Sequence, residues 1–399
     1  MDRARMRVSI YRMMSLASFL VLSTLSNAVG DFDIIYRDKA IYDFALSRLY
    51  DYDLDTAEGT VRALIVRDSL DPKPYFFLTL IQWWRLVGDN YSKSNITAFL
   101  RAARKSLDVD ETKLRALEDD LEAKFYLGAT YGYLAKYYML SNSLLDAYEF
   151  GRKSKNIFDD FVKSDDTLYD AYLAIGTYNC YAGTLPSLLR ILVSVAGMGG
   201  NTENGIQQLK LAADSGCYAR VEALVTLGYV KLELQKDYGQ ATEIFEGLSK
   251  RHESNPVFKL LLAISYRKSG QPGKAIPVCL SCLGDSAVKY VSSNQRASIL
   301  AELAYCYMLG REYEQAAAQY RLCCSMASDE LLVESPWIYY NAGLCEENAR
   351  HFMKAKTWYL KVLNCGDYFG YHSLARKSLE RVEREIGSNR PIDSRQLPK

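Results

Sequence analysis

The chain has 399 residues, of which 49% are hydrophobic and 24% are charged. A chain of this length exceeds one comfortable hydrophobic core, so we expect either two or three domains or one extended repeat array, and the composition excludes a disordered chain. The 49 basic residues balance 48 acidic ones, which excludes the strongly basic surface that is typical of nucleic-acid binding.

Residues 1–28 have the pattern of a secretory signal peptide. An apolar run at 13–25 is followed by Ser26, Asn27 and Ala28, which place small residues before a cleavage site. Positive charge precedes the run at Arg3, Arg5, Arg7 and Arg12. We therefore expect an exported protein, cleaved after Ala28, that lies in the periplasm or cell envelope if the host is bacterial. An uncleaved membrane anchor is the alternative.

Residues 29–165 show apolar side chains at helical spacing in successive segments, which predicts divergent helical hairpins. The segments are 57–66, 74–86, 96–107, 122–138 and 147–161. Asp71 and Pro72 mark a helix stop, and Pro74 marks a restart.

Residues 166–216 depart from this alternation. A first helix with the sequence DAYLAIGTYNCYAG is followed by TLPSLLRILVSVAGMGG, and the second helix begins only at Glu203. The inserted stretch 188–198 is apolar almost all round. It is therefore either buried as an extra helix or offered to a partner or a membrane surface.

Residues 217–366 contain four units of similar sequence, with a period close to the roughly 34 residues of stacked helical hairpins. Each unit has a small residue in its first helix, at Gly228, Ala263, Ala304 and Gly343. Each also has an alanine in its second helix, at Ala241, Ala275, Ala316 and Ala355.

These residues resemble the tetratricopeptide-repeat (TPR) consensus, in which the first small residue lets the two helices of a hairpin approach and the second seats the second helix. The resemblance implies an all-α fold, a right-handed α-solenoid of about seven to eight TPR-like helical hairpins. Residues 169–216 also resemble a eukaryotic TPR family associated with the mitochondrial outer membrane and inclusion-body clearance, and its bacterial relatives. That second resemblance implies a membrane- or lipid-adjacent setting and no catalytic residues.

The last part of the chain is predicted to close the repeat array. Residues 367–387 carry alternating charge on one face of a helix, as expected of a capping helix that covers the seam of the last repeat. Residues 388–399 contain Pro391 and Pro398 and are expected to form a disordered tail.

No arrangement of residues predicts catalysis. The three histidines, His252, His351 and His372, have no partner at metal-binding or nucleophile-activating spacing, and we expect them at solvated surface positions. Cys279 and Cys282 form a CxxC pair at helix positions that favour packing in a repeat core, with a disulfide or redox role as the alternative. We expect no catalytic residue, no cofactor and no metal site, so the chain is not expected to be an enzyme.

Ten side chains are candidates for partner binding. The first helix of each stacked hairpin lines the concave side of the array, and Trp337, Tyr340 and Tyr305 are the expected anchors there. The partner-facing positions of the last repeats are Leu260, Ile264, Arg267, Lys268, Tyr305, Met308, Trp337, Tyr340, Leu344 and Asn348. This surface is aromatic and apolar with few charges, which suits a peptide or helix laid in a groove.

The sequence therefore predicts an exported, non-catalytic scaffold that binds a protein or peptide partner and no nucleic acid. The alternative is a membrane- or lipid-associated factor that uses the apolar insert at 188–198, so association with a membrane surface stays open. The sequence indicates neither the partner nor the oligomeric state.

Overall fold

The computed structural model describes residues 32–183, 199–284, 291–328, 331–332, 335–367 and 370–388. Within these ranges every regular element is a helix. The expected signal peptide, the apolar insert at 188–198 and the tail from residue 389 lie outside them. None of the described helices is long and apolar enough to span a membrane.

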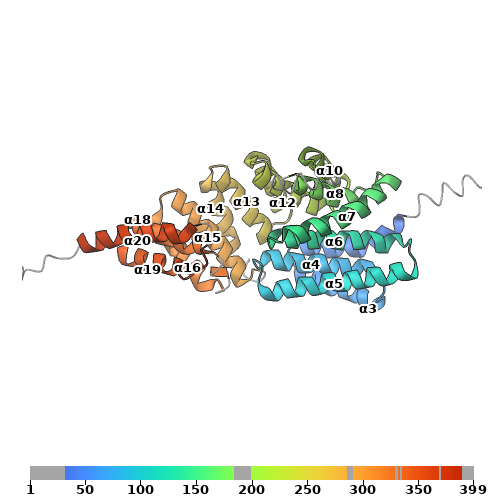
Figure 1. The fold of residues 1–399 in the computed structure, drawn as a ribbon, viewed down its shortest axis with the longest axis horizontal. Coiled ribbons are helices and arrows are strands. Elements are labelled where there is room, and N and C mark those ends of the chain that lie inside the picture. Colours follow the sequence, from blue (N-terminus) through green and yellow to red (C-terminus); the bar gives the residue numbers. More distant parts are fainter. Residues whose placement is uncertain are drawn as a thin grey trace, which may run out of the picture.

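The described helices form eight consecutive hairpins and one closing helix (Figure 1). The first four hairpins are α2 (Lys39–Tyr50) with α3 (Leu54–Arg67), α4 (Pro72–Gly88) with α5 (Lys93–Ala116), α6 (Leu121–Leu140) with α7 (Leu144–Ser164), and α8 (Ala171–Ala182) with α10 (Thr202–Ser215). The next four are α11 (Arg220–Tyr229) with α12 (Tyr238–Arg251), α13 (Pro256–Lys268) with α14 (Pro272–Leu283), α15 (Ser293–Leu309) with α16 (Tyr313–Met326), and α18 (Pro336–Asn348) with α19 (Phe352–Val362). The closing helix is α20 (Tyr371–Ser388).

The predicted all-α solenoid of about seven to eight hairpins with a C-terminal capping helix is confirmed. Helix α20 packs against both α19 and α18, and its Ala375 and Val382 are buried in one cluster with Tyr359. The sequence pattern did not indicate α2, which follows a short 3-10 turn at Asp33–Tyr36.

Local sequence sets the starts of the helices. Proline stands in the first turn of α4, α13, α14 and α18, where its missing N–H costs no hydrogen bond. Asn255 caps α13, because its side chain accepts hydrogen bonds from the backbone N–H groups of Val257 and Phe258 at 2.9 and 3.2 Å. Asp71, Asp120 and Asp237 cap their helices in the same way. Each cap satisfies backbone donors that have no partner inside the helix.

Small residues hold the two helices of a hairpin close together, as the repeat pattern predicted. A Cβ at Gly228 in α11 would lie 2.5 Å from Cζ of Phe245 in α12, and a Cβ at Gly343 in α18 would lie 2.5 Å from Cε1 of Tyr359 in α19. Space for these rings exists only because the opposing residue has no side chain.

One hydrophobic core runs from Ile35 to Leu262 through α2–α8, α12 and the start of α13, with side chains of α11 packed against it. The buried side chains of α10 form two smaller clusters with α8 and α11. The hairpins after this core are held by separate, smaller clusters. Figure 1 shows this division: α3–α12 gather at one end of the molecule, α14–α20 at the other, and α13 lies between them.

The N-terminal core is closed by contacts between distant parts of the chain. The Asn255 side chain donates a hydrogen bond to the backbone carbonyl of Tyr50 at 2.9 Å, and the Ser254 hydroxyl donates one to the carbonyl of Asp51 at 2.6 Å. Nδ1 of His252 lies 3.0 Å from Oδ1 of Asp51, and the His252 side chain is only 11% exposed. The expectation that His252 is a solvated surface residue was therefore wrong, because this histidine lies where the first hairpin meets the end of α12.

Candidate functional site

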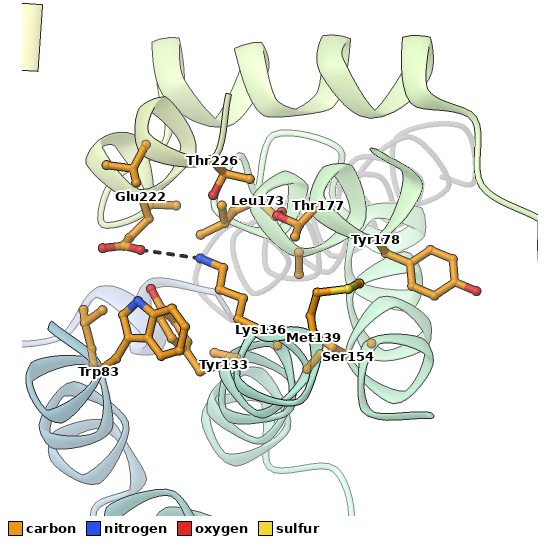
Figure 2. Close-up of a pocket in the computed structure, with 18 of the residues that line it drawn as sticks. Trp83, Tyr133, Lys136, Met139, Ser154, Leu173, Thr177, Tyr178, Glu222 and Thr226 are labelled. Carbon is orange, nitrogen blue, oxygen red and sulfur yellow. Dashed lines mark hydrogen bonds and ion pairs between the residues drawn. The ribbon is translucent and has the colours of Figure 1, made fainter. Parts of the chain in front are cut away.

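The closed N-terminal core contains a cavity of about 310 Å³, here called the N-terminal cavity. Its wall is formed mainly by the first helices of successive hairpins, α4, α6, α8, α11 and α13, with α7 contributing one side (Figure 2). The volume is at the lower end of the range of small-molecule pockets, roughly 300–1,000 Å³.

The wall is mostly apolar and aromatic. Helix α4 contributes Phe76, Leu80, Trp83, Trp84 and Val87, which stand at i, i+4, i+7, i+8 and i+11 and therefore lie on one side of the helix. The α4 side chains that do not face the cavity are also largely buried, because α4 lies between α3, α5, α6 and α13. The cavity is lined by side chains that the surrounding core holds in place.

One ion pair lies in this apolar wall. Nζ of Lys136 in α6 is 3.5 Å from Oε2 of Glu222 in α11, and Figure 2 shows the lysine reaching across the cavity wall to the glutamate. The other carboxylate oxygen of Glu222 accepts hydrogen bonds from Nε1 of Trp84 at 2.7 Å and from the hydroxyl of Tyr50 at 3.3 Å. Burial lowers the pKa of Lys136, and the negative charge of Glu222 opposes that effect. The Lys136 ammonium also lies 4.7 Å from the ring centre of Tyr133.

A second carboxylate, Asp170, lines the cavity at the start of α8. It accepts backbone hydrogen bonds from Cys217 at 2.6 Å, from Tyr218 at 3.0 and 3.1 Å, and from Ala219 at 3.1 Å. These N–H groups immediately precede α11, which begins at Arg220, and the nearby helix N-terminus also favours negative charge. Burial raises the pKa of Asp170, whereas the backbone hydrogen bonds act in the opposite direction.

The predicted partner-binding residues lie elsewhere, on α13, α15 and α18, and we call them the C-terminal surface. They are Leu260, Ile264, Arg267, Lys268, Tyr305, Met308, Trp337, Tyr340, Leu344 and Asn348. Asn348 is exposed and the other nine are half-buried. Helix α13 contacts α15, and α15 contacts α18, so the three helices carry these residues on neighbouring elements.

Neighbouring side chains already occupy the polar groups of the C-terminal surface. Nε of Arg267 is 2.5 Å from Oε1 of Glu302, and its guanidinium lies 4.7 Å from the ring centre of Tyr305. The ammonium of Lys268 pairs with Glu233 at 2.7 Å.

The aromatic part of the C-terminal surface partly supports the capping helix. The ring of Tyr340 lies 5.7 Å from that of Tyr359 and 5.6 Å from that of Tyr371 in α20. Leu344 packs in the same cluster. Partner binding by the ten residues stays a prediction.

The N-terminal cavity was not predicted from the sequence, because the N-terminal hairpins match the repeat pattern less well than the last four. The rule for concave positions, applied to the first helices of these looser hairpins, would have pointed to α4 and α6. No local pattern links Lys136 with Glu222, because the two residues belong to different hairpins.

Cys279 and Cys282, the CxxC pair expected to pack in the repeat core, are buried there. Cys279 and Cys282 are each 1% exposed and pack in one cluster with Cys306, and none of the three forms a disulfide. Burial raises the pKa of Cys282 to about 11 and that of Cys306 to about 12, so these thiols are protonated near neutral pH. Within the described residues no group of three or more His, Cys, Asp or Glu side chains could hold a metal ion.

Comparison with known proteins identifies the fold. No protein-family model matches the chain, and no curated protein sequence matches it. Among solved structures, the chain is similar to human IFIT1 in a dimer with m7Gppp-AAAA, at 10% identity and a TM-score of 0.50, over 84% of this chain and 70% of that one. It is also similar to the Cut9 and Hcn1 hetero-tetramer of APC/C, at 15% identity and a TM-score of 0.47, over 89% and 66%.

A third similar structure is YrrB, described as a TPR protein with an unusual peptide-binding site, at 16% identity and a TM-score of 0.38, over 55% of this chain and 97% of that one. At these identities the similarity concerns the fold alone. The chain therefore shares with these structures an all-α fold of stacked helical hairpins.

Proposed function

We propose that the chain is an exported, non-catalytic TPR scaffold that binds a protein or peptide partner on the inner surface formed by the first helices of its hairpins. The observation that carries the proposal is the direct contact of α13 with α15 and of α15 with α18. This contact makes one continuous surface from helices of three hairpins. A continuous, partly apolar surface is what an extended or helical segment needs for docking.

Tyr305, Met308 and Trp337 are half-buried on this surface. Aromatic side chains that fill a partner's pocket often contribute roughly 2 kcal/mol or more to an interface. Trp337 is supported by a cluster beneath it that includes Cys345 and Tyr320, so its ring is held in place before a partner arrives.

A matched pair of methionine substitutions tests the site. Met308→Glu places a charge on the C-terminal surface, whereas Met353→Glu places the same charge on α19, where Met353 is 66% exposed. Proteins that co-purify with the parent chain should be lost with Met308→Glu and retained with Met353→Glu, as quantified by mass spectrometry. Equal recovery with both variants would show that the partner binds elsewhere.

The anchors are tested by Trp337→Ala combined with Tyr340→Ala. Because Tyr340 supports Tyr371 of α20, the double variant needs a thermal unfolding measurement beside the binding assay. A folded variant with undiminished partner recovery would remove the C-terminal surface from consideration.

Export is part of this proposal and rests on the charge and apolar pattern of residues 1–28. Amino-terminal sequencing of the chain recovered from its natural host should begin at Val29. A chain that keeps Met1 and fractionates with membranes would instead indicate an uncleaved anchor.

A further inference from the structure

The N-terminal cavity shares helix α13 with the C-terminal surface, but other residues line it and it has its own chemistry. Its wall includes the two adjacent tryptophans Trp83 and Trp84 and a ring of other apolar side chains. Leu140, at the end of α6, also lines the cavity and is 54% exposed, so the cavity reaches the surface at the turn between α6 and α7. An apolar space of this size with a few convergent polar groups is the usual form of a small-molecule site.

The charges in the wall are already balanced. Three charged side chains line the described part of the cavity, Lys136, Glu222 and Asp170. Lys136 is paired with Glu222, and Asp170 is held by three backbone N–H groups that immediately precede α11. A carboxylate ligand would meet Glu222 beside the lysine, and an ammonium ligand would meet the lysine beside Glu222. Either charge would be desolvated without a counter-charge, which is costly.

Among the charged groups of the wall, the polar contact that remains available is a hydrogen bond from Lys136; the hydroxyls of Tyr91, Thr226 and Tyr229 also line the cavity. A lysine ammonium has three donors, and its contacts here are one oxygen of Glu222 and the ring face of Tyr133. An uncharged oxygen acceptor can bind such a donor without disturbing the ion pair.

We propose that the N-terminal cavity binds an uncharged molecule with an apolar chain and one hydroxyl or carbonyl oxygen, and that Lys136 donates a hydrogen bond to this oxygen. This binding activity goes beyond the proposed capture of a protein partner and uses different residues. The chain then carries two separable sites, one for a neutral small molecule and one for a protein segment.

Two of the four tryptophans of the chain report directly on the cavity, because Trp83 and Trp84 line it and Trp337 and Trp358 lie on α18 and α19. In a Trp337→Phe, Trp358→Phe background, all tryptophan emission comes from the cavity wall. Three probes of equal chain length each carry a terminal bromine, which quenches indole fluorescence on contact. They are ω-bromo-undecanol, ω-bromo-undecanoate and ω-bromo-undecyl-trimethylammonium.

The alcohol should quench saturably, at about ten-fold lower concentration than either charged probe. In the complementary Trp83→Phe, Trp84→Phe background the alcohol should leave the emission unchanged. Equal quenching by all three probes, quenching in both backgrounds, or tighter binding of the carboxylate would each overturn the proposal.

Two substitutions with matched controls test the residues. Ala174→Phe fills the cavity from α8 and should weaken alcohol binding at least about ten-fold, whereas Ala116→Phe on the exposed end of α5 should not. Lys136→Met should weaken binding of the alcohol and strengthen binding of the trimethylammonium probe, because Glu222 loses its counter-ion. Lys356→Met, which breaks a pair with Glu383 in the C-terminal half, should change neither.

The reversal of charge preference in Lys136→Met is a result that a merely structural lysine would not produce. A Lys136→Met variant that is folded by circular dichroism and keeps the order of preference of the parent would contradict the role of Lys136. Met308→Glu should leave quenching unchanged, so failure of the partner-binding proposal and failure of this one can be distinguished.

Discussion

Asp110 of α5 is fully buried, and neither of its carboxylate oxygens has a hydrogen-bond partner within the described part of the chain. Burial raises the pKa of this carboxyl to about 9, the charges of Asp120 and Glu111 act in the same direction, and Lys113 opposes them. The charge of Glu122 also raises this pKa. The folded protein therefore holds Asp110 protonated at neutral pH, at a cost that the remaining packing of α5 against α4 and α6 must offset.

The first prediction concerns the pH dependence that follows. Because the folded pKa is raised above the unfolded value of 3.8, the unfolded state alone releases the proton between about pH 4 and about pH 9. The free energy of unfolding therefore falls as pH rises through this window. Asp110→Asn removes the ionisation, so the stability difference between variant and parent should grow in favour of the variant by on the order of 1 kcal/mol per pH unit.

Urea unfolding at about pH 5 and about pH 8 measures this difference. Asp108→Asn, at an exposed position of the same helix, is the matched control. A difference for Asp110→Asn that stays constant between the two pH values would show that Asp110 is already ionised in the folded state.

At the scale of a helical hairpin, stability depends on the close approach of two helices at one small residue. Gly228 of α11 faces the ring of Phe245 of α12, with no room for a Cβ. Gly247, also in α12, has nothing within 4 Å of the position of a Cβ. The same hairpin thus contains one glycine required by packing and one that only lowers the stability of its helix.

The second prediction compares these two glycines. Gly228→Ala should lower the free energy of unfolding by roughly 1–3 kcal/mol, because the new methyl group displaces the Phe245 ring. Gly247→Ala should raise it by roughly 0.5–1 kcal/mol, because alanine is the better helix former. Chemical denaturation of both variants checks the opposite signs, and destabilisation by both would mean that the Gly228 contact is not specific.

The hairpins whose small residues recur at a regular spacing were predictable from the sequence. Gly228, Ala263, Ala304 and Gly343 recur near the TPR period, so the last four hairpins were predicted as such. Helix α4 is apolar on nearly every face, which gives a strong helix signal but does not show which side lines a cavity. Helix α2 was missed because it has no matching repeat and a weak apolar stripe, KAIYDFALSRLY.

At the scale of the whole molecule, the sequence could not show that the first five hairpins close on themselves. The bond from Trp84 to Glu222 joins residues 138 positions apart, and that from Asn255 to Tyr50 joins residues 205 positions apart. Such pairs have no local signature, since each residue also satisfies the pattern of its own helix. The N-terminal cavity and its ion pair depend on this closure, and for that reason they were not predicted.

Closure also changes how the array should unfold. In an open repeat array each unit contacts only its neighbours, so a local defect spreads mainly to adjacent repeats. Here Trp84 of α4 contacts Glu222 of α11, Phe258 of α13 and Tyr50 of α2. The N-terminal core should therefore open as one cooperative unit, while the C-terminal hairpins keep the behaviour of an open array.

The third prediction tests this cooperativity. Trp84→Leu removes the hydrogen-bond donor to Glu222 and the aromatic ring contacts. It should lower the free energy of unfolding by roughly 3 kcal/mol. Hydrogen exchange followed by mass spectrometry should show faster exchange in α2, α11 and α13 together, although α11 and α13 are far from α4 in sequence. Val382→Ala, in the buried seam of α20, should accelerate exchange only in α18–α20. If Trp84→Leu affected only α3–α6, the distant contacts would not couple the hairpins, and the cavity would be held together by neighbouring repeats alone.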